Sequence, residues 1–255
     1  MLPFANCKLL GKLDLLESIS RKPIIKSFVD ESLEAYKKEG FECLVDSLCN
    51  NILSKKVKFP LLEYAARLYY EGIEEEFHII FCDLVEARKL EGGNVILGSL
   101  LQLRMEFHYE NSISKAAEYI SKAHIWYVCD IIGERVFGHA LLHHYSKAIQ
   151  DYKKLINSSN HWLLRSLGAG AHLAIKWNLE KEKVKEVFEI LLLVANSKNK
   201  EIRQGIGWAA KTSLKFHPEI AIEFQTVISD ENKVANWFRK KVQIGLERNA
   251  YLKEK

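Results

Sequence analysis

The sequence predicts an all-α protein in which pairs of antiparallel helices stack into a superhelical solenoid. First, apolar residues recur at helical spacing over long stretches, and the strict alternation typical of strands is nearly absent. Second, only four prolines interrupt the 255 residues. Third, similar segments recur at roughly the 40-residue spacing of helical-pair solenoids. Together these observations favour helices over sheet throughout the chain.

Helices are expected on both sides of three short polar connectors. One helix is predicted from five apolar residues at helical spacing: Leu62, Ala65, Ala66, Leu68 and Tyr69. The connectors are residues 91–94 (EGGN), 157–160 (NSSN) and 196–200 (NSKNK). Asn and Ser are suited to turns and to the N-cap of a helix. We therefore expect one helix to end before each connector and another to begin after it.

Four segments that each follow a polar turn are predicted to form the second helix of a repeat: 124–138, 160–177, 200–219 and 234–249. In each segment a polar side chain follows an aromatic or aliphatic anchor: Asp130, Arg165, Arg203 and Arg239. Second helices line the concave surface of a solenoid. We expect the four side chains to converge on one groove, and Trp162, Trp177 and Trp237 to pack between repeats.

Trp126 and Asp130 lie four positions apart in the segment HIWYVCDIIGE (124–134). In a helix, side chains at this spacing share one face. An unpaired Asp130 in a core would cost several kcal/mol, whereas full exposure would leave the indole of Trp126 in water. The pair is therefore predicted to form the wall of a cleft.

The composition, 48% hydrophobic, indicates a folded protein with a sizeable core, which we predict to be one domain over residues 1–255. The apolar runs are shorter than the ~18 residues of a membrane span. Residues 1–16 do not resemble a signal peptide, which predicts a cytoplasmic protein, nucleoid-associated when it acts on DNA. Five cysteines without a C-x-x-C argue against disulfides and a zinc ribbon.

His139 and His143, at i and i+4, could chelate a metal ion, but no third ligand is evident. We therefore expect no metal, and since the sequence also contains no phosphate-cradling Gly loop, we expect no other cofactor. Charge is distributed unevenly, because residues 1–125 carry a net −3 and residues 126–255 a net +7. The second half is thus the part that would attract a polyanion.

Three segments, WYVCD (126–130), SSNHWLLRSLGAGAHLA (158–174) and KEIRQGIGWAAKTSLKFHPEIAIEF (200–224), resemble the DNA alkylation-repair glycosylases built from HEAT-like helical repeats. The resemblance covers residues 115–248 and is poor over 1–114. It implies a solenoid with a concave basic groove, lined by the positions that match the family's motifs: Trp126, Asp130, Arg165 and Trp208.

The resemblance also implies a reaction, hydrolysis of the N-glycosidic bond of positively charged alkylpurines such as 3-alkyladenine and 7-alkylguanine in double-stranded DNA. Asp130 would stabilise the oxocarbenium-like sugar and position water. Trp126 and Trp208 would hold the cation, and Arg165 would bind a phosphate. The auxiliary DNA contacts expected are Arg203, Lys211, Arg239 and Lys240.

The chain departs from the family pattern at three positions of the third segment. Lys211 stands in place of an Arg, Gly205 in place of an Ala, and Gln204 in place of a Lys. Two further functions therefore stay open, a DNA-structure-binding protein without chemistry and a protein–protein adaptor. Polyanion binding would weaken steeply with salt, whereas an apolar protein contact would not. A monomer without an obligate protein partner is expected.

Overall fold

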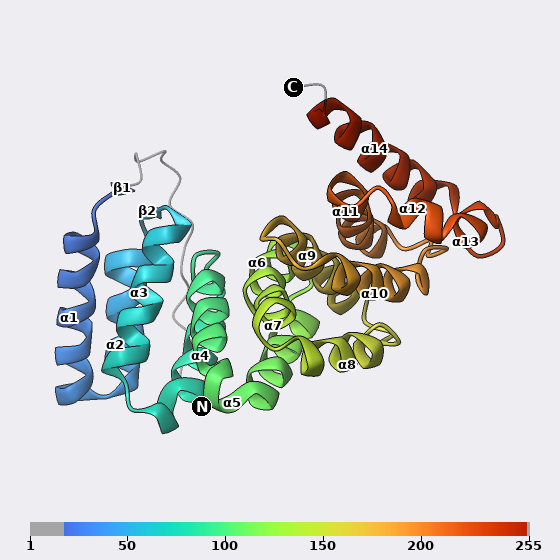
Figure 1. Ribbon diagram of the computed structural model, residues 1–255. Coiled ribbons are helices and arrows are strands. Elements are labelled where there is room, and N and C mark those ends of the chain that lie inside the picture. The colour runs from blue at the N-terminus through green and yellow to red at the C-terminus, as the bar shows by residue number, and fades with distance from the viewer. Residues whose placement is uncertain (1–17, 254–255) are drawn as a thin grey trace, which may run out of the picture.

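The computed structural model describes residues 18–253, which are almost entirely helical (Figure 1). The prediction of an all-α protein is confirmed for this range. Within it, sheet is limited to a parallel pairing of β1 (Ser18–Ile19) with β2 (Lys56–Val57). Cys7 and the stretch 1–16 that was compared with a signal peptide lie outside the described residues.

The helices of the amino-terminal half are α1 (Lys22–Glu39), α2 (Phe41–Leu48), the π-helical turn η1 (Cys49–Leu53), α3 (Phe59–Gly72), the 3-10 turn η2 (Glu75–Phe77), α4 (His78–Ala87) and α5 (Gly93–Ala123). Those that follow are α6 (Trp126–Gly133), the π-helical turn η3 (Glu134–Gly138), α7 (His139–His143), α8 (Tyr145–Leu155), α9 (His161–Lys176), α10 (Lys181–Leu192), α11 (Lys200–Phe216), α12 (Ile220–Glu223), α13 (Gln225–Ser229) and α14 (Asn236–Lys253).

Two of the predicted connectors supply the N-caps of the helices that follow them. The side-chain oxygen of Asn160 accepts hydrogen bonds from the backbone N–H groups of Trp162 and Leu163 at the start of α9. Asn199 caps α11 in the same way. These bonds satisfy N–H groups that have no partner within the helix, and so fix where α9 and α11 begin.

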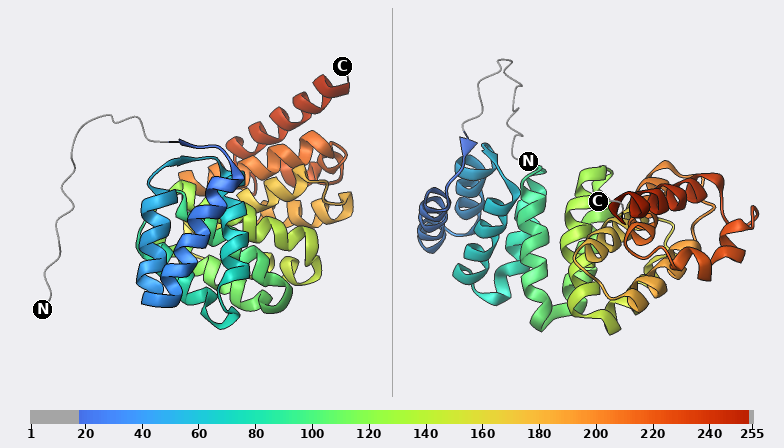
Figure 2. Two further views of the ribbon diagram at one scale, coloured as in Figure 1. Left: turned by 90° about the vertical axis from the view of Figure 1, so that its left-hand side faces the viewer. Right: turned by 45° about the horizontal axis from the view of Figure 1, so that its top comes forward.

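The helices form two layers that follow the chain from one end of the molecule to the other. The inner layer, as we name it, consists of α3, the first half of α5, the run α6–η3–α7, then α9, α11 and α14, each packed against the next. Helices α2, α4, α8 and α10 lie in the other layer. Figure 2 shows this order from two further directions, from the blue amino-terminal helices to the red α14.

Helix α5 passes from one layer to the other at a kink. The backbone of His108 is non-helical there (φ −133°, ψ 51°), and the two halves of α5 run in different directions (Figure 1). No helix within residues 18–253 has the length and apolar character needed to cross a bilayer.

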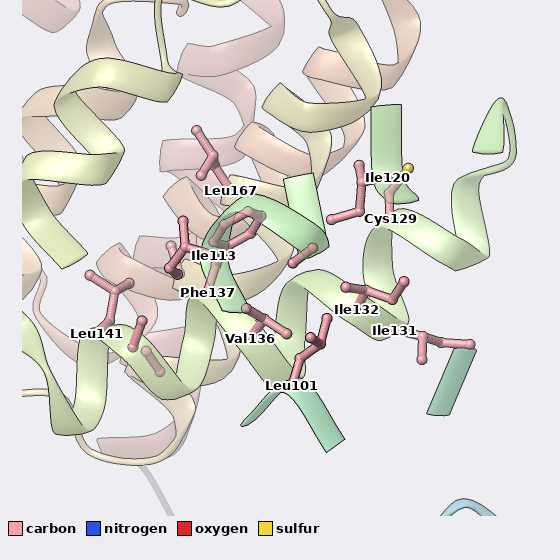
Figure 3. Close-up of a cluster of buried hydrophobic side chains, with 14 of the residues drawn as sticks. Leu101, Ile113, Ile120, Cys129, Ile131, Ile132, Val136, Phe137, Leu141 and Leu167 are labelled. Atoms are coloured by element: carbon pink, nitrogen blue, oxygen red, sulfur yellow. The ribbon is translucent and has the colours of Figure 1, made fainter. Parts of the chain in front are cut away.

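Helices α6, η3 and α7 form one continuous run, residues 126–143, whose apolar side is held in the core. Val136 and Phe137 are almost fully buried and lie in one cluster with Leu101 and Ile113 of α5 and Leu167 of α9 (Figure 3). Burial of each large apolar side chain contributes about 1.5–3 kcal/mol. This packing fixes the rotation of the run, and hence the direction in which its polar side chains project.

Candidate functional site

Trp126 and Asp130 occupy successive turns of α6, as their spacing predicts, but in different environments. The indole of Trp126 is 57% exposed, whereas Asp130 is buried at 9% exposure. An accessible aromatic face therefore lies beside a carboxylate that is largely withdrawn from water. A buried carboxylate is costly unless it is paired and hydrogen-bonded.

Arg165 of α9 is the partner of Asp130. Its Nε donates to Asp130 Oδ1 at 2.8 Å and its Nη2 to Oδ2 at 2.6 Å, a bidentate, charge-assisted pair. Burial disfavours the guanidinium, but the bonds to Asp130 prevail and raise the pKa of Arg165. The Arg165 guanidinium carbon also lies 5.7 Å from the centre of the Trp126 ring, which is within cation–π range. The structure thus brings Trp126, Asp130 and Arg165 together.

Two residues of α11 occupy the remaining terminal nitrogen of Arg165. Nη1 donates to Glu201 Oε2 at 2.7 Å and to Gln204 Oε1 at 2.5 Å. Four of the five guanidinium N–H groups are therefore engaged. Arg165 thus forms an ion pair with carboxylates of both neighbouring helices, α6 and α11. A phosphate contact by Arg165 stays a prediction, and it would have to use the last N–H or displace an acceptor. Two carboxylates face one guanidinium, so this cluster carries a net charge of −1.

The departures at Gln204 and Gly205 fit this arrangement. A Lys at position 204 would place a cation against Arg165, whereas Gln204 supplies an acceptor. A Cβ at position 205 would lie 2.3 Å from the backbone oxygen of Arg165, closer than any real contact. Gly205 therefore allows α11 to approach α9 closely, which brings Glu201 and Gln204 within reach of the guanidinium.

Trp208 lies one turn beyond Gln204 on α11 and stacks on His172 of α9, with ring centres 3.9 Å apart. His172 Nδ1 lies 2.7 Å from the hydroxyl oxygen of Thr212. Burial and the neighbouring lysines lower the pKa of His172 to about 3, so the imidazole is neutral at pH 7. Among the described residues Trp208 has no ring contact with Trp126 and no cation–π contact with Arg165. Trp126 and Trp208, the two predicted aromatic walls, are therefore separate from each other, although both belong to the inner layer.

The predicted DNA contacts of α11 and α14 divide into two groups. Lys211 belongs to a cluster without ion pairs in the described range, which we call the lysine cluster: Lys211, Lys215, Lys241 and Arg248. Burial together with these cations lowers the pKa of Lys211. By contrast, Arg239 pairs with Glu231 at 3.0 Å, and Lys240 is exposed. The roles of Arg239 and Lys240 on DNA stay predictions.

Arg203 and Trp237 lie on neighbouring helices of the inner layer. The Arg203 guanidinium carbon is 5.9 Å from the Trp237 ring, and together with Lys200, Gln204 and Lys241 they line a pocket between α11 and α14. Lys241 belongs to the basic run 239–241, which the sequence offers as a phosphate-binding segment, and it lies four residues after Trp237. Lys215 and Arg248 were not predicted from the sequence.

The prediction that three tryptophans pack between repeats is right for two of them. Trp162 and Trp237 are partly buried against the core, and Trp237 Nε1 donates to the backbone oxygen of Ser197 at 3.0 Å. Trp177 is the exception. It is 66% exposed, because it follows the last turn of α9 and projects beyond the packed part of the helix.

Cysteines and metal ligands show no reactive cluster in the described residues. Cys43, Cys49, Cys82 and Cys129 are free thiols, and burial raises the pKa of Cys82 and Cys129 to about 12. Within residues 18–253 no three His, Cys, Asp or Glu side chains are grouped so that they could hold a metal ion.

Comparisons with known proteins place the chain in a family. The family model described as "DNA alkylation repair enzyme" matches residues 31–241. The crystal structure of AlkD2 from Streptococcus mutans aligns with a TM-score of 0.67 over 80% of this chain and 97% of that chain, at 17% identity. The predicted HEAT-like repeat solenoid is thereby confirmed. An engineered protein aligns with a TM-score of 0.44 and 8% identity, covering 88% of this chain and 96% of its own. No curated protein matches the sequence.

Proposed function

The chain belongs to the DNA alkylation repair enzyme family, and on that premise we propose that it hydrolyses the N-glycosidic bond of positively charged alkylpurines in double-stranded DNA. The observation that carries the proposal is the Asp130 carboxylate, held by Arg165 beside the exposed face of Trp126. In this proposal the protein acts as a monomer, and its chain forms a single domain.

The chemistry requires little activation of the leaving group, because an alkylated purine that carries a positive charge already departs readily. What the protein has to supply is stabilisation of the sugar as it becomes an oxocarbenium ion. Asp130, Glu201 and Arg165 together carry a net −1 in a largely buried setting, where electrostatic attraction is stronger than in water. The cluster therefore favours a cation in front of Trp126.

Asp130 also suits the second requirement, a positioned water. Each carboxylate oxygen accepts one hydrogen bond from Arg165, which leaves lone pairs free for a water molecule. Arg165 holds the carboxylate in one orientation, so that such a water would be presented from a fixed direction. The exposed indole of Trp126 would contact the cationic nucleotide by cation–π attraction.

The DNA backbone would be bound by the lysine cluster rather than by Arg165 alone. Within residues 18–253, Lys211, Lys215, Lys241 and Arg248 form no ion pair with a carboxylate, and we take them as the groups that bind phosphates. They lie on α11 and α14, which follow α9 in the inner layer, and Lys211 is three residues after Trp208. Neutralising several phosphates in this way makes binding strongly dependent on salt.

A second candidate function is recognition of DNA without chemistry. The observation that favours it is the saturation of Arg165 by Asp130, Glu201 and Gln204, because a guanidinium so occupied resists reorganisation around a phosphate. In this case the lysine cluster would still bind DNA, and the Asp130–Arg165 pair would link α6 and α9 as a structural element.

The two candidates are separated by measuring base release and DNA binding on the same preparation. Purified protein is incubated with methylated duplex DNA, and free 7-methylguanine and 3-methyladenine are quantified by chromatography. Release above the spontaneous rate supports the glycosylase. Salt-sensitive DNA binding without release would favour the non-catalytic binder, and absence of both would contradict either candidate and leave the adaptor.

A further inference from the structure

A second polar site begins one turn beyond Asp130 and extends along the run 126–143. Glu134 follows Asp130 at i+4, His139 follows Glu134 at i+5, and His143 follows His139 at i+4. The π-helical turn η3 accommodates the i+5 step, because it inserts one extra residue into the helix. As a result Glu134, His139 and His143 project from one side of the run and line the same pocket.

This pocket, which we call the Glu134 pocket, has a volume of about 280 Å³, close to the lower end of small-molecule sites. It is bounded by four successive members of the inner layer, with Glu63 from α3, Gln102 from α5, the run 126–143, and Trp177 at the end of α9. The three residues that form hydrogen bonds with Arg165, namely Asp130, Glu201 and Gln204, do not line the Glu134 pocket. It is therefore a separate site from the Asp130 cluster.

The charge balance of the pocket leaves one carboxylate without a partner. Glu63 is neutralised by Arg135, whose Nη2 donates to Glu63 Oε1 at 2.6 Å. Glu134, in contrast, forms no hydrogen bond or ion pair within the described residues, although the cations of Arg135 and, more weakly, Lys176 act on it, as do the carboxylates of Asp130 and Glu63. Burial raises the pKa of Glu134, as expected for a carboxylate withdrawn from water. A bound cation would relieve the cost of this burial.

Beyond Glu134 and the Glu63–Arg135 pair, the pocket is lined by His139, His143, Trp177, Gln102 and two leucines. His139 and His143 stack with ring centres 4.2 Å apart, and burial with the neighbouring histidines lowers the pKa of His139 to about 4. Trp177 presents an indole that is 66% exposed and covered by no other ring in the described range. Aromatic faces of this kind attract flat cations, while Gln102 offers an amide for hydrogen bonding.

We propose that the Glu134 pocket binds a flat, positively charged N-alkylated heterocycle, which stacks on Trp177 and pairs its charge with Glu134. The proposal rests on the proposed function only in the choice of a purine as the heterocycle. The site is separate from the Asp130 cluster and begins one turn farther along the run 126–143.

The test is binding of free nucleosides, without DNA and without base release. 1-Methyladenosine carries a positive charge on the ring at pH 7, and adenosine is its uncharged parent. Each is titrated into the ¹⁵N-labelled protein while the indole N–H signal of Trp177, assigned with Trp177→Phe, is followed. We expect 1-methyladenosine to bind at least about tenfold more tightly than adenosine and to shift that signal.

Two variants locate the ligand. Glu134→Gln should reduce the affinity for 1-methyladenosine about tenfold, to that of adenosine, whereas Glu201→Gln, which alters the Asp130 cluster instead, should leave it unchanged. Equal affinity for the two nucleosides, no binding at millimolar concentration, or loss of binding in Asp130→Asn but not in Glu134→Gln would each overturn the proposal. Thermal unfolding of every variant shows that it is folded. Since base release plays no part, this result is independent of whether the chain is a glycosylase.

Discussion

Replacement of Arg165 by Met is expected to lower the free energy of unfolding by about 3–5 kcal/mol. The Arg165 side chain is 8% exposed, and its carboxylate partners Asp130 and Glu201 are 13% and 18% exposed. Met has a similar length, so the cavity that it leaves is small. The cost arises because two carboxylates stay buried without a counterion, which is the situation in which breaking a buried ion pair costs this much.

The assay is equilibrium unfolding in urea at pH 7.5, followed by circular dichroism. Lys26→Met is the matched control, since Lys26 and Asp30 form an ion pair in which both side chains are 55% exposed. An exposed pair contributes little, so this control should not shift the urea midpoint measurably. A loss below about 1 kcal/mol for Arg165→Met would refute the reasoning, because it would mean that the cluster behaves as a solvated surface pair.

Three further predictions concern the neighbouring helices. Gly205→Ala should destabilise the fold by about 1–3 kcal/mol in urea unfolding, because its methyl group would force α11 away from the Arg165 backbone; an unchanged midpoint would contradict this. Lys211→Ala and Lys241→Ala should each reduce the slope of log affinity for duplex DNA against log salt by about 1, and an unaltered slope in both would count against the lysine cluster. The pKa of His172 is about 3 in the folded state, against an ordinary value of 6.5. Below pH 6.5 the unfolded state therefore binds more protons, and the free energy of unfolding decreases as the pH is lowered. His172→Phe, which keeps a ring on Trp208, should remove this component, up to about 1.4 kcal/mol per pH unit; identical pH profiles of wild type and variant in urea titrations would contradict it.

The sequence predicted the architecture well because its evidence is local. Helical periodicity and the Asn residues of the connectors depend on neighbours in the chain, and Asn160 and Asn199 do cap α9 and α11. The juxtaposition of Trp126, Asp130 and Arg165 followed from the repeat length. These features needed no knowledge of how the layers turn relative to one another.

The partners of each side chain across the layers could not be predicted in this way. Glu201 and Gln204 reach Arg165 only because Gly205 permits close packing, which is a property of two helices rather than of one. Trp177 was assigned to packing from its place in the repeat, but the end of α9 projects beyond its neighbours. The π-helical turn η3, which aligns Glu134 with His139, has no periodic signature in the sequence.

The central claim, that Asp130 carries the chemistry, is tested most directly by single-turnover release of 7-methylguanine from methylated duplex DNA. Wild type is compared with Asp130→Asn and with Glu201→Gln. Glu201 pairs with Arg165, as Asp130 does, but lies on α11 rather than beside Trp126 on α6. We expect release by wild type, a rate about 10²–10³-fold lower for Asp130→Asn, and a clearly smaller reduction for Glu201→Gln, which removes the net negative charge of the cluster but keeps the Asp130 carboxylate. Equal rates for wild type and a folded Asp130→Asn, or no release by a wild type that binds DNA, would contradict the claim.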